Sequence, residues 1–358
     1  MDEAPLRVNT FDFLRLMAAL AVVVQHATVH LDSRFLWVDP YDKVWFYDGV
    51  PAFFIISGLF VFRSAVKLHG SEGGWWTFYV NRFLRVAPAI WAYTLVFACF
   101  GLLAGLLRFS DLGSSGGGAW LLSSLLLVPV YSPAFLDGFG VGSANGSLWT
   151  IPAEVSFYIV VPLMVMALSR LKWRWVVVLL GATGWGAVLV LMTLGESLPG
   201  RLFGLTFVPY LWFFTLGIVW YFVADHIELT RMRFILSVIL YITVTWIGYQ
   251  LDSELRPLVV LVAAVPLSYA IVYVGYNGPR VFQLITRRIG DLSFGTYIWH
   301  MPVVNTLIWL DFVGVVGRVW AVPVVLIASL VLAYLSWTFV ERVALRQKRV
   351  SSRGVTSA

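Results

Sequence analysis

FDFLRLMAALAVVVQHATVH, residues 11–30, is the first strongly apolar segment of the chain. It is long enough to cross a bilayer as a helix, which needs about 20 apolar residues. Two ionisable residues, Arg15 and His26, stand inside it. Because a helix turns by roughly 100° per residue, the step between them brings His26 back to the face of Arg15, about three turns further along. Charged side chains at membrane depth are costly, so we expect both residues to face a protein interior.

Each of these residues also has a structural alternative. Arg15 could extend to a membrane interface along its flexible side chain, and His26 could be a hydrogen-bonded core histidine. Asp12, one turn before Arg15, could pair with it and aim its guanidinium. His26 and His30 stand four residues apart but lack the surrounding motif of a metal-binding helix, and we predict no metal site.

The composition of the whole chain indicates a polytopic helical membrane protein. Of the 358 residues, 60% are hydrophobic and only 12% are charged, and the mean hydropathy is +0.84. A soluble domain does not need so much apolar surface. The net charge of +6 is better explained by membrane topology than by nucleic acid, and we expect no nucleic-acid partner.

Long apolar runs predict an all-α membrane bundle of about ten transmembrane helices. The runs are residues 13–31, 45–64, 86–107, 152–168, 174–194, 205–223, 234–250, 257–275, 293–311 and 319–340. A further run at residues 119–131 is short and contains Pro129. We expect this run to be re-entrant or interfacial rather than a full crossing.

The positive charges predict cytoplasmic N- and C-termini. With ten crossings and the N-terminus inside, 18 lysines and arginines lie on the cytoplasmic side and six lie on the other, while Arg15 lies in the membrane. A full crossing at residues 119–131 would reverse this bias in the second half of the chain. We therefore expect one membrane domain over residues 1–345 and a basic, disordered cytoplasmic tail over residues 346–358.

The segment FYVNRFLRVAP, residues 78–88, places Arg82 and Arg85 three residues apart at the cytoplasmic start of the third predicted span. On a helix they share one face beside the helix N-terminus, where backbone amides also favour anions. Together they can bind phosphate. The alternative is that they serve only the positive-inside bias.

The segment NGSLWTIPAEVSFY, residues 145–158, enters the fourth predicted span from the outer side. Glu154 lies just inside the apolar region, where an unpaired carboxylate is strongly disfavoured, and a histidine is a natural partner for it. Asn145, Ser147 and Trp149 could contact a polar ligand or only shape the loop. Trp149 could also be an interfacial anchor.

The segment IGDLSFGTYIWHMP, residues 289–302, begins the ninth predicted span. His300 lies about two turns into it, with Ser293 and Tyr297 at helical spacing on a nearby face. His300 could hydrogen-bond to a ligand, or it could join two helices.

Together these segments resemble the acyltransferase 3 family of integral membrane acyltransferases. The resemblance covers nearly the whole chain and rests on five motifs in order: FDFLRLMAALAVVVQH, VPAFFIISGLFVFRS, FYVNRFLRVAP, NGSLWTIPAEVSFY and IGDLSFGTYIWHMPV. It implies ten membrane helices and transfer of an acyl group, usually acetyl, from cytoplasmic acyl-CoA to a hydroxyl of a glycan or similar acceptor. By matching position it places Arg15, His26 and Glu154 in the site. It assigns coenzyme A recognition to Arg82 and Arg85.

The chain departs from the family pattern in two places. Many members end with a Glu-Arg-Pro turn, where this chain has Glu341, Arg342 and Val343. Members that modify peptidoglycan or O-antigen often carry an appended esterase-like domain, and we expect the standalone form here. The acceptors expected of that form are exopolysaccharide intermediates, glycolipids or glycosylated small molecules, in a bacterial-type inner membrane.

We hypothesise that His26 is the general base for the acceptor hydroxyl, with Glu154 as its orienting carboxylate and Arg15 holding part of the donor. An acyl-His26 intermediate stays open in place of direct transfer. One rival is a proton-coupled transporter that uses Arg15, His26 and Glu154 as a relay. Another is a non-catalytic polysaccharide export partner, in which Arg82 and Arg85 have little role. The oligomeric state, monomer or homodimer, also stays open.

Overall fold

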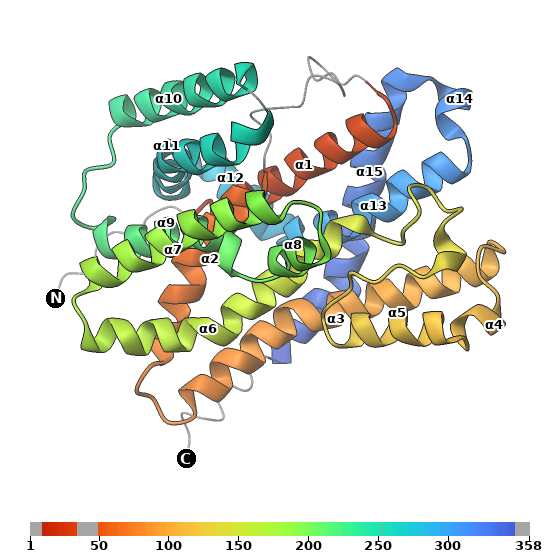
Figure 1. Ribbon diagram of the computed structural model, residues 1–358, viewed down its shortest axis with the longest axis horizontal. Helices are drawn as coiled ribbons and strands as arrows, with labels where there is room; N and C mark the ends of the chain where they lie inside the picture. Colours follow the sequence, from red (N-terminus) through yellow and green to blue (C-terminus); the bar gives the residue numbers. More distant parts are fainter. Residues whose placement is uncertain (1–8, 34–48, 252, 348–358) are drawn as a thin grey trace. The chain divides into compact units, whose positions relative to one another are not determined.

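The computed structural model describes residues 9–33, 49–251 and 253–347, and every regular element in these ranges is a helix (Figure 1). The expected all-α fold is confirmed. The chain divides into two compact units. Unit 1 comprises residues 9–18, 49–75 and 156–289 except 252, and unit 2 comprises residues 19–33, 76–155 and 290–347. The unit boundaries fall within three helices, α1 (Phe11–His30), α3 (Gly74–Leu103) and α6 (Thr150–Arg170).

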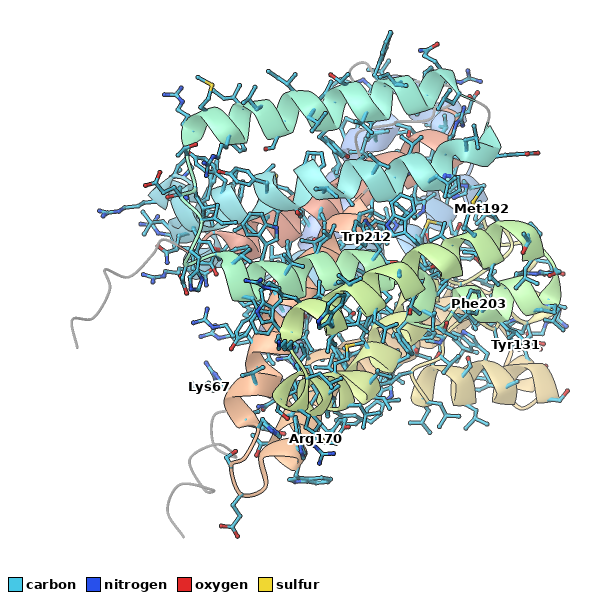
Figure 2. The ribbon with its side chains drawn as sticks, turned by 60° about the vertical axis from the view of Figure 1, so that its left-hand side comes forward. Lys67, Tyr131, Arg170, Met192, Phe203 and Trp212 are labelled. Atoms are coloured by element: carbon cyan, nitrogen blue, oxygen red, sulfur yellow. The ribbon has the colours of Figure 1, made fainter. Side chains whose placement is uncertain are left out.

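Unit 1 is built around α9 (Leu211–Val223), most of whose side chains are buried. Helix α2 (Gly49–Leu68) lies along α9, and the approach is so close that a Cβ on Gly58 would overlap the Phe214 carbonyl. Trp212 of α9 donates a 2.8 Å hydrogen bond to the Leu261 carbonyl (Figure 2). The other elements of the unit are α7 (Trp173–Leu194), α8 (Leu198–Gly204), η3 (Val208–Tyr210), α10 (Arg231–Gln250), η4 (Ser253–Leu255), α11 (Arg256–Asn277) and α12 (Arg280–Ile289).

Unit 2 is built around α13 (Ser293–Trp309), which packs along α15 (Arg318–Ser336). A Cβ on Gly295 would come within 2.9 Å of the Ala333 Cα, so glycine is needed for this packing. Residues of the second half of α1 join both helices in one apolar core. The other elements are α4 (Phe109–Leu112), α5 (Ser115–Leu125), η1 (Ala134–Leu136), η2 (Gly146–Trp149), α14 (Phe312–Val316) and η5 (Trp337–Glu341).

Each of the ten predicted spans overlaps a helix of the structure, and residues 45–48 of the second span lie outside the described residues. Within the described residues, eight helices are long and apolar enough to cross a membrane. A ninth span is formed if α8 and the η3–α9 segment, which are bent by 56°, act as one. The tenth prediction corresponds to α13, whose 17 residues match the lower end of the range for a spanning helix, about 17. The chain is therefore a multi-pass membrane protein.

The short apolar run at residues 119–131 does not form a full span. It folds as α5, which has 11 residues and is followed at Leu127 by a left-handed backbone with φ of 59°. Eleven helical residues cover about 16 Å, roughly half of a hydrocarbon core. Several large apolar side chains of this run are exposed: Leu121, Leu122, Leu125, Leu126, Val128 and Val130. The helix is thus too short to cross, while its placement at an interface remains a prediction.

Helix α10 illustrates the apolar exterior of the bundle. Leu236, Ile239, Leu240 and Trp246 are each more than half exposed, and Figure 2 shows side chains fanning out from this helix. Such a surface suits lipid and is unsuited to water. At the other end of the chain, residues 342–347 continue as helix, so the first two residues of the predicted tail are ordered, while residues 348–358 lie outside the described residues.

Candidate active site

Two histidines from distant parts of the chain meet in unit 2. The Nδ1 atom of His26, on α1, lies 2.8 Å from the Nε2 atom of His300, on α13. The two rings are parallel to within 1°, with their centroids 5.0 Å apart. The helix-to-helix hydrogen bond that the sequence offered as one role for His300 is therefore present, and its partner is His26.

A second hydrogen bond, from His300 to the backbone of Tyr297, determines which ring nitrogen of each histidine carries the proton. The Nδ1 atom of His300 lies 2.7 Å from the Tyr297 backbone carbonyl, which can only accept. His300 Nδ1 must therefore carry the proton, and in neutral His300 the Nε2 atom is an acceptor. Consequently His26 Nδ1 is the donor between the two rings. Neutral His26 then keeps an unprotonated Nε2 atom with a lone pair.

The two histidines differ in their access to solvent. His300 is completely buried, at 0% exposure, whereas His26 is partly exposed. His30 lies close to His26, with 5.8 Å between ring centroids. No group of three or more His, Cys, Asp or Glu residues within the described ranges could hold a metal ion. The partly exposed His26 ring can therefore reach a reactant, whereas the buried His300 ring can only support His26.

The segment that precedes α6 is hydrogen-bonded to α13. The Asn145 amide donates a 2.7 Å bond to the Ile298 carbonyl, and its oxygen accepts bonds from the Ser147 amide (3.1 Å) and hydroxyl (2.7 Å). The Tyr297 hydroxyl donates to the Ser147 carbonyl and lies 2.8 Å from the Thr150 hydroxyl. Asn145 and Ser147 thus shape the loop and hold it against the helix that carries His300.

Glu154 lies on α6, one turn after Thr150, and is partly buried. Its carboxylate is close enough to Tyr297 to act on that hydroxyl electrostatically. The hydrogen bond of His26, however, goes to His300. His300 reaches the His26 ring from a helix far along the chain, and the role of Glu154 as an orienting carboxylate stays a prediction.

Arg85 forms an ion pair inside unit 2. Its Nη2 atom lies 2.6 Å from the Asp291 Oδ2 atom, and the two side chains are 20% and 11% exposed. Asp291 Oδ1 accepts bonds from the Ser293 amide (3.2 Å) and hydroxyl (2.5 Å), directly at the start of α13. The structure adds a carboxylate partner for Arg85, and the phosphate role of Arg82 and Arg85 stays a prediction. Arg82 lies one turn earlier on α3, with its guanidinium 5.8 Å from the Phe78 ring centroid.

Glu341 is a buried acid that the sequence interpretation treated only as part of the final turn. It lies in η5, is 2% exposed, and accepts a 3.0 Å hydrogen bond from Ser336. It interacts electrostatically with Arg85 and Asp291. In the sequence, the only indication of this buried acid was its position, as a single acidic residue at the end of the last apolar run. It lies near the Arg85–Asp291 pair at the start of α13.

Arg15 and Asp12 belong to unit 1. Their predicted contact is present, with the Arg15 Nη1 atom 3.4 Å from the Asp12 Oδ1 atom. The Arg15 guanidinium also lies 5.6 Å from the Phe60 ring centroid. The sequence thus located this local pair correctly. The role of Arg15 in holding a donor remains a prediction.

Comparison with known proteins shows which family this chain is similar to. The model of an acyltransferase domain matches residues 8–338. Nodulation protein 10 of Rhizobium leguminosarum bv. viciae is 28% identical, over 94% of this chain and 93% of its own length. Peptidoglycan O-acetyltransferase OatA of Listeria monocytogenes is 23% identical over 93% of the chain, and putative peptidoglycan O-acetyltransferase YrhL of Bacillus subtilis is 24% identical over 92%. The chain spans about half the length of these last two proteins, 55% and 54%. No solved structure matches.

Proposed function

Since the chain belongs to the acyltransferase 3 family, we propose that it is an integral membrane O-acyltransferase in which the His26 Nε2 atom is the general base. The acyl group is acetyl in the first instance, in keeping with the two O-acetyltransferase relatives. The single observation that carries the assignment of the base is the hydrogen-bond chain from His26 through His300 to the Tyr297 carbonyl. This series of hydrogen bonds leaves an unprotonated Nε2 atom, with its lone pair, on His26, which is the more exposed of the two rings.

The proposed reaction is direct transfer. The acceptor hydroxyl gives its proton to His26 Nε2 while its oxygen forms an ester bond with the acyl carbon and the bond from that carbon to sulfur breaks. The proton then passes from His26 to the leaving sulfur, which restores neutral His26 and yields a thiol. A positioned general base of this kind contributes about 10²- to 10⁴-fold to the rate.

His300 is proposed as a positioning residue. Once His26 accepts the proton, the hydrogen bond from its Nδ1 atom to His300 Nε2 becomes charge-assisted and stronger. The Tyr297 carbonyl keeps His300 in the required tautomer. The arrangement performs with neutral groups the orienting task that a carboxylate performs in a Ser-His-Asp triad.

The donor is proposed to be a cytoplasmic acyl-CoA. Because Arg85 is held by Asp291, we assign contact with a donor phosphate to Arg82 and anchoring of α13 to Arg85. The acceptor is proposed to be a carbohydrate hydroxyl, the chemistry that the name of the peptidoglycan relatives implies for those proteins. The membrane is proposed to be a bacterial-type inner membrane, with both termini in the cytoplasm.

Acyl transfer by the purified chain in lipid nanodiscs tests the proposal. The protein is incubated with acetyl-CoA and a membrane extract of glycan acceptors, and both thiol release and the acetyl mass shift of the glycans are measured. His26→Ala should lower turnover at least about 100-fold, the smaller end of the range for a general base. His69→Ala, which removes an exposed histidine of unit 1, is the matched control. Near-normal turnover of His26→Ala would reject the base.

A further inference from the structure

Unit 2 contains a small cavity beside the segment that precedes α6. Its volume is about 90 Å³. Tyr93 of α3 and two residues of α5, Trp120 and Ser124, line it together with Asn145 and Trp149. Since one water occupies roughly 30 Å³ of liquid, the cavity has room for about three waters or for the edge of a small ring. Tyr131, which is 44% exposed, lies at its rim and is labelled in Figure 2.

Two hydroxyls that line the cavity are buried without a hydrogen-bond partner. They are the Tyr93 hydroxyl and the Ser124 hydroxyl, on side chains that are 1% and 2% exposed. The Asn145 amide lies near the Tyr93 hydroxyl; one of its two N–H groups donates to the Ile298 carbonyl, and its oxygen accepts from Ser147. Buried hydroxyls are nearly always hydrogen-bonded, because leaving one unsatisfied costs free energy. Two such groups in one cavity therefore indicate a ligand with polar atoms of its own.

The remaining lining residues define the chemistry of that ligand. Aromatic rings of Trp120, Trp149 and Tyr131 supply flat apolar surface, and none of the described lining residues carries a charge. The site therefore has nothing to neutralise a phosphate or a carboxylate. A sugar residue has the complementary properties, because its ring carries apolar C–H faces together with hydroxyls that both donate and accept.

Two residues that line the cavity contact α13, the helix that carries His300. Asn145, which lines the cavity, donates its hydrogen bond to the Ile298 carbonyl, two residues before His300 on α13. Tyr93 packs its ring edge to face against Trp299, with centroids 5.5 Å apart. The walls of the cavity thus touch Ile298 and Trp299, the two residues between Tyr297 and His300.

We propose that this cavity binds one edge of a neutral sugar residue of the acceptor, through the hydroxyls of Tyr93 and Ser124 and the rings of Trp120 and Trp149. The assignment of the occupant as acceptor rests on the proposed function. The cavity holds the sugar edge, and the rest of the glycan extends past Tyr131.

Binding of N-acetylglucosamine to the purified full chain in detergent tests this site without any acyl donor. Tryptophan fluorescence is the readout, since Trp120 and Trp149 line the cavity. Wild type should show a saturable change, and Tyr93→Phe and Ser124→Ala should each weaken the affinity about tenfold, the effect of one lost hydrogen bond to a ligand. Tyr334→Phe, which removes a hydroxyl from a half-exposed tyrosine of α15, should not weaken it.

The outcomes separate this site from the proposed function. Binding that depends on Tyr93 and Ser124 in a chain that transfers no acyl group would keep the site and reject the function. Equal affinity in the variants, or no saturable response in wild type, would overturn the site and leave the hydroxyls bonded to water. If the Tyr93 hydroxyl binds the sugar rather than stabilising the fold, Tyr93→Phe should unfold near the wild-type temperature. A clearly lower temperature would reveal a structural bond and also overturn the site.

Discussion

The start and the middle of α13 carry two polar networks of opposite character. At its start, Asp291 joins Arg85 and the amide of Ser293 in an ionic arrangement that is mostly buried. Seven residues after Ser293, His300 belongs to a chain of neutral groups that ends at the lone pair of His26. The charged network holds the helix in place, while the neutral network presents a base. The comparison teaches that the charged groups at the start of this helix differ in task from the neutral groups in its middle, the former serving structure and the latter chemistry.

The largest expected effect is a loss of folding stability when the charged network at the start of α13 is broken. Asp291→Ala removes the carboxylate of Arg85 and the acceptor of the Ser293 amide, and loss of one partner of a buried ion pair costs about 3 kcal/mol. Thermal unfolding of the purified protein in detergent measures this loss. Asp291→Asn keeps an acceptor for Ser293 and should lose less.

The exposed Asp137→Asn is the control for that measurement and should unfold like wild type. If Asp291→Ala also unfolded like wild type, the start of α13 would not be anchored by this pair. The double variant Arg85→Ala with Asp291→Ala should be more stable than the sum of the single losses predicts, because it leaves no uncompensated charge.

The second effect is a loss of turnover when the neutral network in the middle of α13 is broken. His300→Ala removes the acceptor of the His26 Nδ1–H bond but leaves the Nε2 base in place, so kcat should fall about 10- to 100-fold, less than on loss of the base. The KM for the donor should stay unchanged. Residues that act as a unit are not additive, so adding His300→Ala to His26→Ala should cost nothing further. Additive losses in steady-state kinetics would place His300 outside the unit.

The third effect distinguishes the two arginines of α3. Arg82→Ala should raise the KM for acetyl-CoA about tenfold with little change in unfolding temperature, since a charge-assisted contact with a phosphate is worth roughly 1.5 kcal/mol. Arg85→Ala should do the reverse and lower the unfolding temperature. Equal KM increases in both variants would restore a shared phosphate role and contradict the anchoring role of Arg85.

The smallest effect separates the Tyr297 side chain from its backbone. Tyr297→Phe removes the hydroxyl that contacts Ser147 and Thr150, at a cost of about 1 kcal/mol in unfolding free energy. The backbone carbonyl that holds His300 is untouched, and therefore kcat should stay within about twofold, a change of under 0.5 kcal/mol in barrier. A large loss of kcat in a folded Tyr297→Phe protein would show that the hydroxyl itself has a role in catalysis.

Local features of the sequence predicted their part of the structure well. Within the described residues, each of the ten apolar runs overlaps a helix, because length and hydropathy decide whether a segment can span a membrane. The Asp12 and Arg15 contact was predictable because residues three apart on a helix are neighbours. The sequence also predicted that α5 is too short to span the membrane, because its apolar run is short and contains Pro129.

The contacts that define the candidate site are not local. His26 and His300 are 274 positions apart, and Arg85 and Asp291 are 206 positions apart. Helical spacing indicates which face each residue occupies but not which helix will pack there. For this reason the sequence did not predict the contact of His26 with His300 or the ion pair of Arg85 with Asp291.

The central claim is that His26 stands as a neutral base with its proton on Nδ1 and a lone pair on Nε2. Nitrogen-15 NMR of the histidine-labelled protein in lipid bilayers near neutral pH tests it most directly, with the His26 signals assigned by their loss in His26→Ala. We predict a protonated Nδ1 and an unprotonated Nε2 for His26, and a change of that tautomer balance in His300→Ala. A His26 ring protonated on Nε2, or on both nitrogens, would contradict the account.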